Sequence, residues 1–168
     1  MKHFLLIFSC CILFFSCEET KEPTNINAVN WKNRTVNLPK IDSLAKGQSY
    51  LSVYSEIYSI TEHRTINLTV TVSLRNVSTL HNIYLFKANY YNTKGDLIRT
   101  YFDEPISLKP LETIEIVIDE KDDHGGSGAN FVFDWALSNN DHEPFFEAVM
   151  ISTSGQQGIS FTTQGIKL

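Results

Sequence analysis

One uninterrupted pattern constrains the fold of this chain more than any other feature of the sequence. Residues 65–75 alternate polar and apolar side chains without a break. Successive side chains of a β-strand point to opposite faces, so this alternation predicts a long, half-buried antiparallel strand. Its apolar face would carry Ile66, Leu68, Val70, Val72 and Leu74. No segment after residue 48 shows a sustained helical period, which excludes an all-helical fold.

Seven further segments have the composition and the flanking turn residues of short strands. They are residues 50–58, 82–92, 97–102, 113–119, 130–137, 145–151 and 158–163. Eight short strands in about 120 residues predict an all-β fold, an antiparallel two-sheet sandwich of immunoglobulin-like size. A small closed β-barrel is the alternative. Two apolar stripes are expected to fill the core, namely Phe131, Phe133 and Trp135 on one strand and Ile114, Ile116 and Ile118 on another.

The first seventeen residues have the features of an export signal. Lys2 and His3 precede an apolar run at residues 4–15, and Ser16 and Cys17 stand before a polar stretch. A helix of about twelve residues rises only about 18 Å, too short for a hydrocarbon core of about 30 Å. The Ser16-Cys17 junction resembles the lipobox of bacterial lipoprotein precursors. That resemblance implies cleavage before Cys17 and acylation of its thiol, with palmitate as the expected acyl chain.

The lipobox departs from the usual pattern at one place, and the polar stretch after it sets the expected domain boundaries. Phe14 and Phe15 depart from the lipobox pattern, which favours smaller or aliphatic residues, and an ordinary signal peptide is the alternative. We expect a signal peptide at residues 1–16, a lipidated Cys17 with a flexible tether at 17–48, and one domain at 49–168. The tether is polar, and its apolar residues follow neither the helical nor the strand period.

Cysteine content and charge exclude several function classes. All three cysteines lie within the first seventeen residues, so the exported domain has no disulfide, catalytic thiol or cysteine zinc site. The chain carries 14 basic and 19 acidic residues, a net charge of −5, and loss of Lys2 with the signal makes it −6. An acidic chain is a poor partner for nucleic acid, and acyl chains rather than electrostatic attraction would hold it at a membrane.

Short patterns in the tether suggest where the protein is exported. The acidic residues directly after Cys17 resemble the surface-export signal of Bacteroidetes lipoproteins. Asp42-Ser43-Leu44 resembles the short site at which Bacteroidetes attach O-glycans to exported proteins. The sequence therefore predicts the bacterial cell envelope, with lipid anchoring in the outer membrane. The periplasmic and surface faces both stay open.

Several segments of the predicted domain together resemble a known family. They are Tyr54-Ser55-Glu56-Ile57-Tyr58, Leu74-Arg75-Asn76, residues 90–95, Gly125-Gly126-Ser127-Gly128-Ala129-Asn130-Phe131, residues 147–151 and Gln157-Gly158-Ile159-Ser160-Phe161. Their order over residues 50–166 is similar to the bacterial domain-of-unknown-function family 3124. The resemblance implies a small exported or lipid-anchored domain, and it brings no activity, cofactor or catalytic residue with it.

The loop before residue 131 is the candidate functional site. Gly125, Gly126 and Gly128 free the backbone to adopt positive φ, and a site built here would also use Ser127 and Asn130. No phosphate loop is expected, because a strand follows where a helix would be needed. The acids before the glycines are hard-cation ligands in type but lack calcium-loop spacing, and they are Asp119, Glu120, Asp122 and Asp123.

Three functions are compatible with these features. The leading hypothesis is a non-enzymatic binding or interaction module without a cofactor, whose partner is an envelope protein or a glycan. A structural accessory of an envelope assembly is the second. A hydrolase built on Ser127 and His124 is the third, although the Gly-x-Ser-x-Gly elbow is missing. For the glycine loop itself, a backbone requirement for small residues competes with a binding role.

Overall fold

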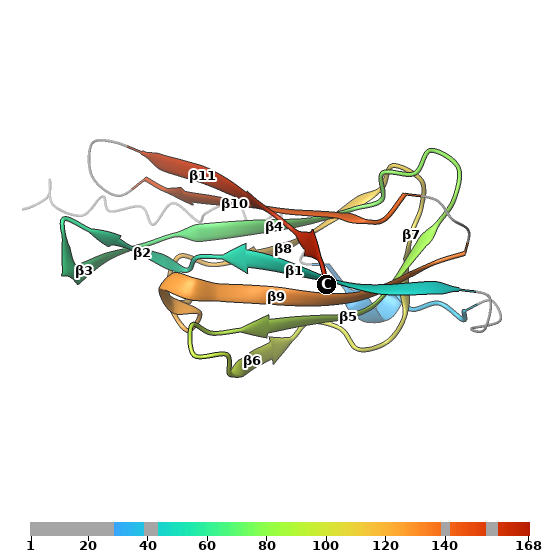
Figure 1. Ribbon diagram of the computed structural model, residues 1–168, viewed down its shortest axis with the longest axis horizontal. Helices are drawn as coiled ribbons and strands as arrows, with labels where there is room; N and C mark the ends of the chain where they lie inside the picture. Colours follow the sequence, from blue (N-terminus) through green and yellow to red (C-terminus); the bar gives the residue numbers. More distant parts are fainter. Residues whose placement is uncertain (1–28, 39–43, 139–141, 154–157) are drawn as a thin grey trace, which may run out of the picture.

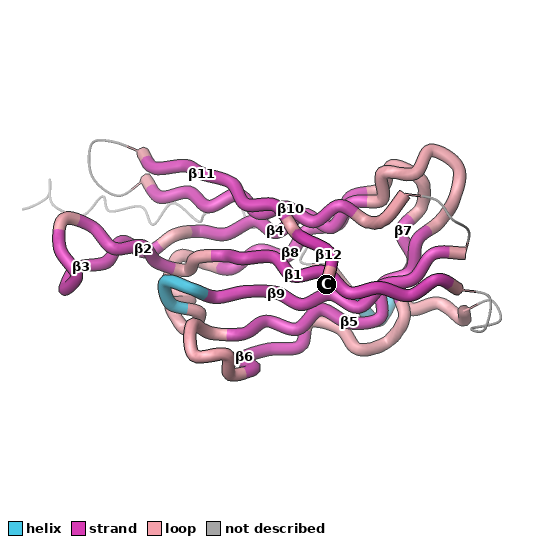
Figure 2. The backbone as a smooth tube through the Cα atoms, viewed as in Figure 1, coloured by secondary structure: helices cyan, strands magenta, loops and turns pink. Residues whose placement is uncertain are grey.

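The computed structural model of the chain describes residues 29–38, 44–138, 142–153 and 158–168. Short strands form almost all of its regular structure (Figure 2). They are β1 (Ala45–Val53), β2 (Glu56–Ser59), β3 (Thr61–Asn67), β4 (Thr69–Arg75), β5 (Ile83–Tyr91), β6 (Leu97–Thr100), β7 (Ile106–Leu108), β8 (Thr113–Ile118), β9 (Ala129–Leu137), β10 (Phe145–Ser152), β11 (Ile159–Gln164) and β12 (Ile166–Lys167). The described residues also contain two 3₁₀ turns, η2 (Trp31–Arg34) and η4 (Gly126–Gly128). None of the helices in these ranges could span a membrane.

The strands form two antiparallel sheets and one hairpin (Figure 1). The larger sheet has the order β12-β1-β9-β5-β6, and β7 pairs with the first half of β5. The smaller sheet has the order β11-β10-β4-β8. The β2–β3 hairpin stands off from the end of the sandwich (Figure 1). The predicted two-sheet sandwich is therefore confirmed, and the sheets do not close into the alternative barrel.

The predicted apolar stripes meet between the two sheets. Ile114, Ile116 and Ile118 of β8 and Phe131, Phe133 and Trp135 of β9 all belong to the buried core. An aromatic column runs through this core, in which Tyr90 stacks on Phe131 with ring centroids 4.8 Å apart. Phe133 stacks on Phe146 at 4.2 Å and so connects β9 of the larger sheet to β10 of the smaller one. These stacked rings fix the spacing of the sheets.

Two of the predicted strands are interrupted in the structure. The alternation at residues 65–75 predicted one strand, but the chain leaves the hairpin at Asn67 and enters the sheet at Thr69. Between them the Leu68 N–H donates to the Ser55 carbonyl at 2.8 Å, and Ile66 is only half-buried. The predicted strand at 50–58 likewise divides at residues 54–55 into β1 and β2. The sequence did not reveal either break, because the segments on both sides of it are themselves strands. The structure also contains β7 and β12, which were not predicted.

The described part of the predicted tether packs against the domain. The Trp31 ring lies 5.0 Å from the ring of Phe102, centroid to centroid. The Val36 N–H donates to the Pro105 carbonyl at 2.9 Å, and Thr35 forms a β-bridge with Ile106. The Arg34 guanidinium forms an ion pair with Glu112. These contacts hold residues 31–36 against the sandwich.

Candidate functional site

The glycine loop is a packed connection between strands. Gly126 has a φ of +73°, which confirms the expectation that at least one of the three glycines adopts positive φ. Its carbonyl accepts a hydrogen bond from the Ser55 N–H at 3.1 Å. Thr93 donates from its N–H and its Oγ1 to the Gly125 carbonyl and accepts at Oγ1 from the Gly128 N–H at 2.9 Å. The loop is thus fastened to the β5–β6 turn and to the residue before β2.

Gly125 is small for a steric reason. Its φ is −69°, which any residue can adopt, but an added Cβ would collide with the Tyr90 hydroxyl and with Ser55 Oγ. These two hydroxyl groups are fully buried and hydrogen-bonded to each other at 2.9 Å. Burial raises the pKa of the Tyr90 hydroxyl above its ordinary value, so this hydroxyl stays protonated. Gly125 is therefore small because of side-chain packing, whereas the positive φ of Gly126 supports the backbone explanation of the loop.

The other predicted loop residues do not converge on a reaction centre. Asn130 is part of β9 and pairs in register with Ser52 of β1 and Tyr91 of β5. Ser127 lies within η4 and is half-buried. The His124 Nδ1 atom is 2.9 Å from Asp122 Oδ1, so this ring is engaged by a carboxylate of the preceding turn. Sequence proximity had suggested that these residues act together, whereas in the structure Asn130 pairs within the sheet and His124 contacts Asp122.

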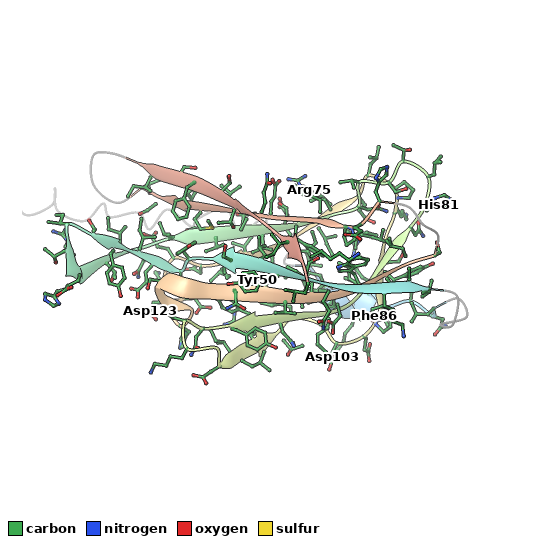
Figure 3. The ribbon with its side chains drawn as sticks, in the orientation of Figure 1. Tyr50, Arg75, His81, Phe86, Asp103 and Asp123 are labelled. Carbon is green, nitrogen blue, oxygen red and sulfur yellow. The ribbon has the colours of Figure 1, made fainter. Side chains whose placement is uncertain are left out.

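The acidic candidates lie in the turn that follows β8. Asp119 Oδ1 accepts a hydrogen bond from the Lys121 N–H at 2.8 Å, and Asp122 Oδ2 accepts one from Arg99 at 2.9 Å. Glu120 is half-buried, and Asp123 is exposed at the end of the sandwich where β9 begins (Figure 3). Among the described residues, no three His, Cys, Asp or Glu side chains are grouped so as to hold a metal ion.

Asp122 is the electrostatic centre of this turn. Burial alone would raise the pKa of its carboxyl, but hydrogen bonds from His124 and Arg99 outweigh burial and lower this pKa below its ordinary value. Arg99 also donates to the Tyr101 hydroxyl at 3.0 Å, and its guanidinium lies 5.5 Å from the centre of the Tyr101 ring. The contacts among Asp122, His124 and Arg99 hold the 119–124 turn against strand β6 and so have a structural role.

A groove on the outer face of the larger sheet has the composition of a binding site. It has a volume of about 460 Å³. Its walls are Lys46, Gly47, Gln48, Phe86, Asp134, Trp135 and Leu168. Gln48 Nε2 donates to Asp134 Oδ1 across the β1–β9 pair at 2.7 Å. An aromatic ring thus lies beside a connected amide and carboxylate, an arrangement that can both stack on a ligand and hydrogen-bond it.

A β-bulge places the ring of this groove. In the β5–β9 register, Leu85 pairs with Trp135 and Lys87 pairs with Asp134, so Phe86 is an extra residue on β5. Leu85 points into the core, and Phe86 is turned to the outer face, where it is half-buried (Figure 3). Bulges commonly redirect a side chain beside a functional site. No local pattern in the sequence marks this bulge, because residues 83–86 form a continuous apolar and aromatic run.

A second groove follows the edge strand β8, and we call it the β8 groove. Its volume is about 730 Å³. Five consecutive residues of β8, Thr113, Ile114, Glu115, Ile116 and Val117, form one wall, and Val29, Trp31, Arg34, Arg75 and Tyr101 complete it. Trp31 and Arg34 belong to the segment that the sequence assigned to the tether. Their role depends on long-range packing that no local pattern reveals.

A comparison with known protein families assigns the chain to one of them. The sequence profile of a family described as "Protein of unknown function (DUF3124)" matches residues 46–168. The chain belongs to the DUF3124 family. No curated protein and no solved structure matches it. The DUF3124 match extends from β1 to β12, so it contains both the groove at Phe86 and the β8 strand, whereas Trp31 and Arg34 precede it.

Two predicted modification sites lie wholly or partly outside the described residues. Cys17, Asp42 and Ser43 are not among them. Leu44, the last residue of the predicted O-glycan site, is described and buried. Lipid attachment and glycosylation of this DUF3124 protein therefore stay predictions of the sequence.

Proposed function

We propose that this protein is a lipid-anchored, non-enzymatic binding module of the bacterial cell envelope, and that its ligand is a glycan bound on the outer face of the larger sheet. The sequence supports the anchor, since a basic start, a short apolar run and Ser16-Cys17 form the export signal. Acylation of Cys17 would hold the domain at the outer membrane. The acidic mature chain needs such an anchor because anionic lipids repel it.

The composition of the outer face carries the proposal. Besides Phe86, the outward-facing positions of β1 and β5 hold three half-buried tyrosines, Tyr50, Tyr84 and Tyr91. Polar side chains lie between them, because Asn130 pairs with Tyr91 in register and Gln48 pairs with Asp134. The face therefore alternates aromatic rings with amides and a carboxylate.

This chemistry fits a sugar better than an apolar ligand. The ring of a pyranose has apolar C–H faces that stack on aromatic rings, and its hydroxyl groups need both hydrogen-bond donors and acceptors. In the groove, Phe86 offers the ring, while Lys46, Gln48 and Asp134 offer donors and acceptors. Aromatic anchors lose little conformational entropy on binding, which suits an open site on a rigid sheet.

A direct binding measurement tests the proposal. Purified mature chain carrying Cys17→Ala would be titrated with solubilised peptidoglycan fragments and with neutral and acidic polysaccharides, and binding would be followed by calorimetry. Phe86→Ala should weaken binding at least about tenfold, since a buried aromatic contact commonly contributes this much or more. Tyr58→Ala, which truncates an exposed ring on the remote β2–β3 hairpin, is the matched control. Equal affinity of all three proteins, or binding by none, would contradict the proposal.

The β2–β3 hairpin favours the structural-accessory role as a second candidate. Ile60 at its tip is 86% exposed and has a φ of +69°, a conformation unusual for a β-branched residue. An accessory would use such a projecting apolar tip to dock on a protein of the assembly. Ile60→Asn keeps a residue that tolerates positive φ but removes the apolar side chain. It should abolish recovery of a stoichiometric partner from solubilised envelope without lowering thermal stability.

A further inference from the structure

In the part of the chain that the structure describes, the β8 strand is an open edge of the smaller sheet. Among the described residues it pairs only with β4, through six consecutive register pairs without a bulge. Natural edge strands are usually blunted by Pro, Lys, a bulge or short length, because free backbone groups attract other strands. In β8 five of six residues are β-branched, and Glu115 is the one charged residue. The strand is thus well suited to pair on its open side.

The hydrogen-bond ladder shows which residues face that open side. The Asn76 N–H donates to the Glu112 carbonyl at 2.9 Å, and this bond continues the β4–β8 register by one pair. In antiparallel ladders, hydrogen-bonded and non-hydrogen-bonded pairs alternate. The backbone groups of Ile114, Ile116 and Ile118 therefore bond to β4. Those of Thr113, Glu115 and Val117 point to the open edge.

The open edge lies in a groove that is already shaped. Consecutive residues of β8 line the β8 groove, so it runs along the strand over about 17 Å at the usual rise of a strand. Trp31 and Tyr101 form aromatic parts of the remaining wall. A chain that entered the groove could place alternate side chains against these two rings.

An unsatisfied donor indicates that the groove takes a hydrogen-bond acceptor. Arg34 lines the groove and forms an ion pair with Glu112, yet its Nε atom is buried and has no hydrogen-bond partner among the described residues. Buried donors are almost always paired in folded proteins. A backbone carbonyl or a carboxylate of a bound chain would supply the missing acceptor.

We propose that the β8 groove is a strand-addition site for an extended segment of a partner protein. The segment binds antiparallel to β8 and hydrogen-bonds to the outward backbone groups of Thr113, Glu115 and Val117. It carries apolar side chains toward Trp31 and Tyr101 and a basic residue beside Glu115. A second copy of β8 fits less well, because two Glu115 carboxylates would enter one short interface. This site is separate from the proposed glycan face.

Photo-crosslinking in living cells identifies the protein segment that occupies the β8 groove. The full lipoprotein would carry benzoylphenylalanine in place of Val117, whose side chain is 54% exposed at the open edge, and in place of Ile151 as a control. Ile151 is 42% exposed in the central strand β10 of the same sheet. We expect a crosslink from position 117 alone to an alternating segment of another protein. Crosslinks to a second copy or to the N-terminal residues of the same chain would overturn the proposal, as would equal crosslinking from both positions.

A pair of substitutions at one position then tests the binding mode. A synthetic peptide with the crosslinked sequence would be titrated into the full lipoprotein in detergent. Val117→Pro removes an outward N–H but no bond to β4, as Pro is tolerated at sheet edges, and it should weaken binding at least about tenfold through loss of the ladder. Val117→Ala keeps the N–H and should change the affinity less than about threefold. Thermal unfolding of both variants checks that they fold. Equal loss in both variants, or loss in neither, would refute strand addition.

Discussion

The packing of Gly125 leads to a quantitative prediction about stability. Gly125→Ala would push a methyl group into the buried pair formed by the Tyr90 hydroxyl and Ser55 Oγ. Overpacking of a dense core costs about 1–3 kcal/mol, and separation of a buried hydrogen-bonded pair adds about 1–3 kcal/mol. We expect the variant to lose about 2–6 kcal/mol of unfolding free energy, a large share of the 5–15 kcal/mol that is usual for a domain.

Gly95→Ala is the matched control for this steric argument. Gly95 has a φ of +85°, and a Cβ added there would meet no atom within 4 Å. Its substitution should therefore cost only the backbone strain, about 1 kcal/mol. Ser127→Ala, in the same loop as Gly125, should be nearly neutral. Urea unfolding followed by fluorescence of Trp31 and Trp135 measures all three variants, and an unchanged slope would show that only the midpoint moved.

A rescue experiment can refute the argument. The double variant Ser55→Ala with Tyr90→Phe removes both oxygens that the new Cβ would meet, and loss of both partners of a hydrogen bond is far less costly than loss of one. In that background Gly125→Ala should cost clearly less than in the wild type, and the cost that is left comes from the close contact with Ala129 Cβ at 2.9 Å. If Gly125→Ala is as destabilising there as in the wild type, or costs no more than Gly95→Ala, the steric explanation is wrong.

Three further predictions concern the anchor, the redox state and pH. Cys17→Ala should release the protein from the membrane fraction or block its processing, and membrane retention of a correctly cleaved variant would count against acylation. Thermal stability of residues 29–168 should be the same with and without a thiol reductant, as this part has no cysteine. Because the pKa of the Asp122 carboxyl is lower in the folded state, its ionised form stabilises the fold above the unfolded-state pKa of about 4. This stabilisation is lost as pH falls through the folded-state pKa. The stability difference between wild type and Asp122→Asn should therefore shrink in acid, and a difference that is independent of pH would exclude this role.

The sequence predicted the sandwich because its core strands obey simple alternation. The stripes of β8 and β9 are buried as their period requires, and the turn signals separate most strands correctly. The break at Leu68 was missed because the last residues of β3 continue the polar and apolar alternation of β4, and a change of sheet does not disturb the period. β7 and β12 have three and two residues, which is too short for any periodicity to show.

The glycine loop was singled out from the sequence for a related reason. The Gly125–Asn130 segment concentrates glycine, serine and acidic residues, which are the types that local motifs highlight. In the structure the glycines of this loop pack against residues that are distant in sequence. Ser55, Tyr90 and Thr93 leave no space for a side chain on them. A lone glycine cluster does not reveal whether a ligand or a buried hydroxyl pair is responsible for its lack of side chains.

The surfaces proposed for binding depend on register, which single-sequence patterns do not contain. Phe86 reaches the outer face because one residue of β5 is extra relative to β9, and the offset appears only when both strands are paired. The open backbone groups of Glu115 and Val117 are identified only by the bond between Asn76 and Glu112. In a sandwich without cysteines or a catalytic motif, recognition can reside in the sheets themselves. A bulge then determines which ring is presented, and an unpaired edge determines which chain can be added.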